Sequence, residues 1–281
     1  MLKNINSIAV FALVLSVATP GATAETRPSV SDLLAQVQAT YDKMQSYSSA
    51  GDVTSNTTIP GFAQQELHST FSIKLARPDL YRIEWEMPTM MNRGAVWSAG
   101  DGNFITTPMQ ASPTQMKDMS MALGMATGIS GGAANTIPSI FFRLNSNSLK
   151  RSKDAAFGPD AAIDGDPCYV ITKKAGTIRT TMWISEKSKL IRQIRDDSTG
   201  PTRMPEMTDN QLSEVLQSMG QKPTAEGIKS MRAMMAAQQA WMNVGATTVR
   251  IEAQRQVVVN ATLRKADFAT KIAPAEKGPP R

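Results

Sequence analysis

A strict alternation of apolar and charged side chains is the feature that most constrains the fold of this chain. Between Pro78 and Pro88, every second residue is large and apolar: Tyr81, Ile83, Trp85 and Met87. The residues between them are arginine and glutamate. A period of two places one set of side chains on each face of a β-strand. The segment is therefore predicted to be a half-buried strand.

Similar segments recur along the chain and are separated by turns rather than by helices. Strands are expected at residues 67–75, 95–99, 103–107, 168–173, 177–185, 190–195 and 247–263. The dipeptide Asp101-Gly102 is typical of a hairpin turn. Strands joined by short turns pair in antiparallel fashion. The sequence therefore predicts an α+β fold with one broad, twisted antiparallel sheet.

A helix is predicted before the sheet. Apolar residues share one helical face here: Val30, Leu33, Leu34, Val37, Tyr41 and Met44. Ser29 or Ser31 can accept a hydrogen bond from a free backbone N–H at its start.

The first 24 residues are predicted to be a cleaved signal peptide. Lys3 precedes an apolar run at residues 8–17, and Ala22-Thr23-Ala24 forms a small-residue cleavage site. The run is about half of the roughly 20 apolar residues that a membrane-spanning helix needs. We expect a periplasmic or secreted protein with a single domain at residues 25–275 and a flexible tail at 276–281.

Composition argues against several classes of function. The net charge is +6, but no Lys/Arg block is dense enough to indicate a nucleic-acid partner. The single cysteine and single histidine exclude an internal disulfide, a multi-cysteine metal site and most histidine-based catalysis. No cofactor motif is present, so no cofactor is expected and the chain is predicted to be non-enzymatic.

Two insertions at residues 109–144 and 201–245 contain 12 of the 18 methionines. The second is predicted to form helices at 209–219 and 224–242. Methionine is flexible and makes adaptable apolar surfaces, so helices of this kind suit a lid over an apolar cavity. Thioether sulfur also favours Cu(I), so a periplasmic copper-binding protein is an alternative interpretation. Plain core packing is a third.

Four further features receive structural interpretations. The string Gly128-Ile129-Ser130-Gly131-Gly132 fits a nucleophile elbow, but its histidine should follow it and His68 precedes it. A glycine turn between two helical pieces is favoured. His68 is assigned to a solvent face and Cys168 to the core. Glu84 and Glu86 share one strand face and are assigned to solvent.

The segment Ala76-Arg77-Pro78-Asp79-Leu80-Tyr81-Arg82-Ile83-Glu84-Trp85 resembles the R-P-x-x-[FY]-[RN]-[FIW] strand of the LolA/LolB family of lipoprotein-sorting proteins. Other weak motifs keep the family's order. They are Val96-Trp97 before Gly100-Asp101-Gly102-Asn103, the strand at 165–172, and Asp267-Phe268 before Pro274.

The resemblance implies an open, half-barrel antiparallel sheet whose concave face, closed by helices, holds acyl chains or another apolar ligand. It also implies that Arg77 contacts the lid and helps to hold it shut. The expected ligand-binding and lid residues are Arg77, Tyr81, Ile83, Trp85, Met116, Met119, Met231 and Met234. The expected partner is a hydrophobic ligand or lipoprotein, with a membrane-bound partner also possible. A sensor module for mislocalised lipoproteins is a further alternative.

Overall fold

A computed structural model describes residues 27–107, 112–144, 149, 152, 154–199, 207–218, 222–242 and 245–270. The predicted signal peptide and the predicted tail lie outside the described residues.

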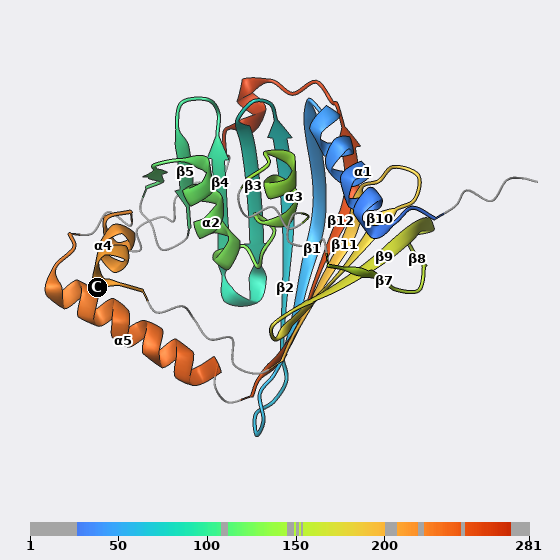
Figure 1. The fold of residues 1–281 in the computed structure, drawn as a ribbon. Helices are drawn as coiled ribbons and strands as arrows, with labels where there is room; N and C mark the ends of the chain where they lie inside the picture. Colours follow the sequence, from blue (N-terminus) through green and yellow to red (C-terminus); the bar gives the residue numbers. More distant parts are fainter. Residues whose placement is uncertain are drawn as a thin grey trace, which may run out of the picture.

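The strands form one open antiparallel sheet in the order β6-β5-β4-β3-β2-β1-β12-β11-β10-β9-β7, with β8 paired to β9 (Figure 1). Their bounds are β1 Ser46–Thr58, β2 Gln65–Ala76, β3 Leu80–Met87, β4 Asn92–Ser98, β5 Asn103–Thr106, β6 Thr114–Met116, β7 Ala156–Phe157, β8 Ala161–Ile163, β9 Asp166–Ala175, β10 Ile178–Ser185, β11 Ile191–Thr199 and β12 Thr247–Val259. The end strands β6 and β7 are not paired with each other. The predicted α+β class and the predicted open antiparallel sheet are confirmed.

The central strand β1 was not expected. Its sequence contains four serines together with Gly51, Asp52 and Asn56, residue types that are typical of turns rather than of strands. It is nevertheless paired along nearly its whole length with β2 on one side and β12 on the other. Tertiary pairing has overridden weak local propensity here.

Three helices lie on one face of the sheet (Figure 1). They are α1 Val30–Lys43, α2 Met119–Ile129 and α3 Thr136–Phe141. The α1 helix agrees with the predicted one, and Ser29 Oγ caps it by accepting a hydrogen bond from Asp32 N at 3.1 Å. We call residues 112–144, which include α2 and α3, the lid segment.

The core lies between these helices and the concave face of the sheet. The inward set of β3 meets the buried face of α1 and the apolar residues of α3. Tyr41, Tyr81, Ile83 and Phe141 are all 0% exposed. Side chains therefore fill the space between the sheet and helices α1 and α3 at these positions.

The second insertion forms α4 Asp209–Ser218 and α5 Ala225–Met242, close to the predicted bounds. These two helices pack on each other, and Gly227 lies against Leu216. Figure 1 shows the pair to one side of the sheet, beyond α2 and the β4–β5 end. Short 3-10 helices lie at Pro88–Met90 and Lys265–Phe268.

Candidate ligand-binding site

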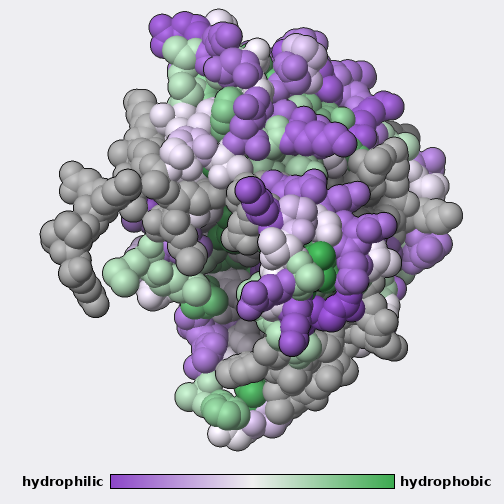
Figure 2. Space-filling model, turned by 90° about the vertical axis from the view of Figure 1, so that its left-hand side faces the viewer, coloured by the Kyte–Doolittle hydropathy of each residue, from purple (hydrophilic) through white to green (hydrophobic). Residues whose placement is uncertain are grey.

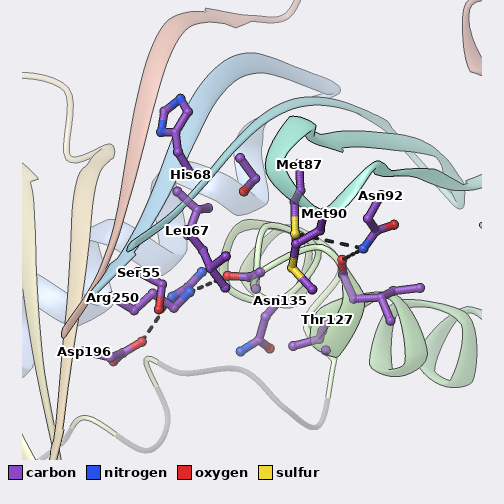
Figure 3. A pocket seen from close by; sticks show the side chains of 16 residues that line it. Ser55, Leu67, His68, Met87, Met90, Asn92, Thr127, Asn135, Asp196 and Arg250 are labelled. Atoms are coloured by element: carbon purple, nitrogen blue, oxygen red, sulfur yellow. Dashed lines mark hydrogen bonds and ion pairs between the residues drawn. The ribbon is translucent and has the colours of Figure 1, made fainter. Parts of the chain in front are cut away.

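Next to this filled core, a cavity of about 640 Å³ remains between the concave face and the lid segment. Strands β1 and β2 and the β3–β4 connection form one wall, and the end of α2 with the following turn forms the other. Its apolar lining comes from Val53, Leu67, Met87, Met90 and Ile129. Figure 3 shows Met87 and Met90 at one end, and Arg250, Asp196 and Ser55 at the other. We call this the first cavity.

A second cavity of about 460 Å³ lies over β9 to β12. Its polar side chains come from Asn135, Thr136, Ser152, Lys173, Thr180, Asp196, Ser198, Thr248 and Arg250. Its apolar side chains come from Ala175, Ile178, Met182 and Ile194. Asn135, Asp196 and Arg250 line both cavities and therefore form a shared wall.

The strand register explains why these residues meet. Six residues lie directly opposite one another across six neighbouring strands, in the order Lys173, Thr180, Asp196, Arg250, Ser55, Leu67. Residues opposite each other in an antiparallel sheet point to the same face. The row thus crosses the concave face, with Lys173 in the second cavity and Leu67 in the first.

Arg250 joins the sheet to the lid segment. Its Nε donates to the carbonyl oxygen of Gly131, in the turn between α2 and α3. Its Nη1 donates to Asp196 Oδ2 at 3.1 Å, and its Nη2 donates to Glu252 Oε2 at 2.6 Å. The guanidinium group is therefore held by two carboxylates and in turn holds the lid backbone.

A chain of buried hydrogen bonds continues from Arg250 through Glu252 and Gln254 to Ser49. Glu252, which is 0% exposed, accepts from Gln254 Nε2 at 2.8 Å, and Gln254 Oε1 accepts from Ser49 Oγ at 2.8 Å. Burial of Glu252 raises the pKa of its carboxyl group above the ordinary value, although the charge of Arg250 acts in the opposite direction. On the other side, Thr180 Oγ1 donates to Asp196 at 2.7 Å.

Arg77 makes a second connection to the lid segment. Its Nη2 donates to the carbonyl oxygen of Phe141 at 2.7 Å and to that of Tyr41 at 3.3 Å. Its Nε donates to the carbonyl oxygen of Met44 at 3.2 Å, and the guanidinium carbon lies 4.6 Å from the Phe141 ring centroid. Arg77 thus links the C-terminal ends of α1 and α3.

The predicted ligand-contacting residues occupy other places. None of the eight lines either cavity. Tyr81, Ile83, Trp85 and Met116 are at most 4% exposed and fill the core, because α1, α2 and α3 pack directly on that part of the sheet. Met119 packs partly buried against the same core.

The remaining two predicted residues belong to α5. Met231 is half-buried and Met234 is 59% exposed. None of the described residues of α4 and α5 lines either cavity. Figure 2 views the molecule from the left-hand side of Figure 1. The coloured surface there is largely hydrophilic, with hydrophobic residues in small separate groups. The methionines that line the first cavity are instead Met87 and Met90, which lie outside both methionine-rich insertions. Met109, Met204 and Met219 lie outside the described residues.

The glycine-rich string of the lid segment is a structural turn, as predicted. Ser130 is 0% exposed and lies just after α2, and its Oγ accepts from Ala134 N at 3.3 Å. His68 is exposed and lines the first cavity from β2, but its ring points away from the other labelled side chains (Figure 3). A nucleophile–base pair is therefore not assembled by these two residues.

The assignments of Cys168 to the core and of Glu86 to solvent also hold, whereas Glu84 is half-buried. Cys168 is 0% exposed in β9, and burial raises the pKa of its thiol. Glu86 is exposed. Glu84 pairs with Arg82 at 3.5 Å on the face away from the core and accepts from Thr270 Oγ1 at 3.2 Å.

Sequence reasoning missed the residues of the shared wall. Strand β12 alternates Val249, Ile251 and Ala253 with Arg250, Glu252 and Gln254. The usual pattern would bury the apolar set. In the structure, Glu252 and Gln254 are 0% and 1% exposed, Ala253 is 6% exposed, and Val249 and Ile251 are only half-buried. No sequence signal reveals the burial of these polar side chains, because their polar partners come partly from other strands.

Comparison with known proteins gave structural similarity only. No family model matches the chain, and no curated protein matches it. Similar solved structures include a LolA superfamily protein from Nitrosomonas europaea, with a TM-score of 0.31, 9% identity and coverage of 87% of this chain and 99% of that one. A DUF1329 family protein from Desulfovibrio piger has a TM-score of 0.32, 12% identity and coverage of 86% and 96%.

A domain from Vibrio parahaemolyticus, named as an outer membrane lipoprotein-sorting protein domain, has a TM-score of 0.33, 8% identity and coverage of 84% and 94%. Among the described helices, none is both long enough and apolar enough to cross a membrane.

Proposed function

We propose that this protein is a periplasmic binding or carrier protein for a hydrophobic ligand such as a lipid or the acyl chains of a lipoprotein, and that it carries out no chemistry on that ligand. The observation that carries the proposal is the first cavity. A space of about 640 Å³ lies between a curved sheet and a lid segment held by side-chain contacts, and its lining includes Val53, Leu67, Met87, Met90 and Ile129.

The size and lining of this cavity suit a lipid chain. Small-molecule sites in proteins commonly have volumes of about 300 to 1,000 Å³ and largely apolar walls. Each methylene group removed from water contributes about 0.8 kcal/mol, so a dozen would contribute on the order of 10 kcal/mol. Flexible methionine side chains can adjust to chains of different shape.

The lid segment gives the cavity a means of opening. Its α2–α3 turn is fastened to β12 by Arg250, and the end of α3 is fastened by Arg77. We propose that these two arginines bias the lid segment towards the closed arrangement. Each contact is a hydrogen bond from a charged group to a carbonyl oxygen, which contributes about 1.5 to 3 kcal/mol. A ligand that binds strongly can offset costs of this size.

A probe-uptake experiment tests the proposal. The purified protein, titrated with a fluorescent fatty-acid probe, should show saturable binding and should release bound lipid in native mass spectrometry. The variant Thr127→Trp places an indole in the first cavity, because Thr127 on α2 lines it, and should abolish uptake.

The matched control is Gly124→Trp. Gly124 lies on the same helix, is exposed, and has open space around the position of an added Cβ atom. This variant should bind the probe as the wild type does. Equal uptake by both tryptophan variants, or no uptake by the wild-type protein, would contradict a ligand site in the first cavity.

A further inference from the structure

The second cavity differs from the first in its charge. Lys173 lines it from β9, is only partly exposed, and makes no ion pair with any described residue. The Asn135 amide lines it from the lid segment and makes no side-chain hydrogen bond with the part of the chain that the structure describes. A cation and an amide that both face a cavity without partners are suited to an anionic group.

The acidic residue in the same wall is already occupied. Asp196 Oδ1 accepts from Thr180 and Asp196 Oδ2 accepts from Arg250. The second carboxyl group on Arg250 is that of Glu252, whose Oε2 accepts from Arg250 Nη2 at 2.6 Å. Both carboxyl groups of this wall are thus paired with Arg250, and Lys173 makes no ion pair with a residue that the structure describes.

The two cavities meet at Asn135, Asp196 and Arg250. Lys173 lies three strands from Arg250 in the cross-strand row, a separation of about 14 Å between their backbones at about 4.8 Å per strand. The side chains of Lys173 and Arg250 lie on the same, concave face of the sheet, at the two ends of this three-strand separation. We propose that the two cavities form one site for an anionic amphiphile, with its acyl chain in the first cavity and its acidic headgroup in the second, where Lys173 and Asn135 bind it. This inference rests on the proposed function and specifies its ligand.

The test compares an acid with its neutral ester. The probes are cis-parinaric acid and its methyl ester, which share one fluorescent chain, and the variant is Lys173→Gln. Wild-type protein should bind the acid about tenfold more tightly than the ester, which corresponds to one charge-assisted hydrogen bond. In Lys173→Gln this preference should disappear through weaker binding of the acid, with ester binding unchanged. The preference of the wild type should also decrease as salt is added.

The control is Lys174→Gln. Lys174 is the next residue on β9, points to the opposite face and is exposed. It should keep the wild-type preference, and circular dichroism of both variants verifies that they are folded. Displacement of the probe by hexadecanoate or by hexadecyl phosphate then identifies a carboxylate or a phosphate as the preferred headgroup.

The outcomes separate the two proposals. If the ester binds as well as the acid, or if Lys173→Gln keeps the preference for the acid, the headgroup site is refuted while chain binding stands. If neither probe binds, both the headgroup site and the carrier function are refuted.

Discussion

The guanidinium group of Arg250 occupies the space that a side chain on Gly132 would need. A Cβ atom built on Gly132 would lie 2.2 Å from Arg250 Nη2. Gly132 also has a φ of 99°, a backbone conformation that other residues rarely adopt. The glycine is therefore required at this position for two independent reasons, and both concern the closed position of the lid segment.

The substitution Gly132→Ala should destabilise the protein by about 2 kcal/mol or more, because it adds backbone strain and displaces Arg250. Urea unfolding measures this change. Gly128→Ala provides the comparison, since Gly128 lies in α2 with nothing within 4 Å of an added Cβ atom. Alanine there should leave stability unchanged or raise it by about 0.5 kcal/mol. Similar losses at both glycines would contradict the role assigned to Arg250.

Replacing Arg77 with lysine should weaken the connection between α1 and α3. Lysine keeps the charge but cannot place three donors on the carbonyl oxygens of Tyr41, Met44 and Phe141. We expect a loss of about 1 to 3 kcal/mol in the free energy of unfolding and faster amide hydrogen exchange in α3.

Arg143→Lys is the matched control for Arg77→Lys. Arg143 also joins this region to α1, through Asp42, but its side chain is 62% exposed. Exposed ion pairs contribute little to stability, so this variant should behave almost as the wild type does. A larger effect at Arg143 than at Arg77 would show that the buried contacts do not fasten the lid segment.

The buried Glu252 should make stability depend on pH. Its pKa is higher in the folded protein than the ordinary value of 4.5. A carboxyl group of this kind binds a proton more readily when folded, so its stabilising contribution is complete below pH 4.5 and is lost as pH rises through the folded-state pKa. Glu252→Gln is neutral at every pH and should remove this dependence.

Urea unfolding of wild-type protein and Glu252→Gln at several pH values between about 4.5 and 8 measures this linkage. The stability of the variant relative to the wild type should increase as pH rises. Other titrating groups, such as Asp42, whose pKa is lowered by its bond to Arg143, contribute equally to both proteins and cancel. Parallel stability curves would show that Glu252 does not titrate in this range.

The labelling rate of the single thiol, Cys168, measures how often strand β9 becomes exposed to solvent. Cys168 is 0% exposed and its pKa is raised by burial, so both access and thiolate formation are suppressed. A disulfide reagent should label the native protein slowly, and the labelling rate should rise with urea in parallel with global unfolding. Rapid labelling without denaturant would mean that this part of the sheet opens locally.

The sequence predicted the fold best where local patterns were strong. The alternation in β3 and the helical period of α1 both led to elements close to the observed ones. The central strand β1 was missed because its residues are typical of turns, and its stability comes from neighbours that are far away in the sequence.

The candidate site was less accessible to sequence reasoning. Apolar alternation in β3 identified residues that fill the core, because the helices cover that part of the sheet. The cavity wall comes from a row that depends on register across six strands, and no linear pattern encodes such a row. The family resemblance drew attention to Arg77, which lines neither cavity, whereas no sequence signal drew attention to Arg250, which lines both.

Two arginines bind the lid segment on either side of α3: Arg250 at Gly131, before the helix, and Arg77 at Phe141, at its end. Because the lid segment is bound at two places, it cannot move away from the sheet as one body until at least one of the two arginine contacts breaks. Under the proposed carrier function, breaking the Arg250 contact before the Arg77 contact would let the α2–α3 turn move away from β12 while the end of α3 stays bound, and would open the first cavity beside Leu67 and Met90. The order in which the two contacts break would then determine the side from which the proposed ligand enters.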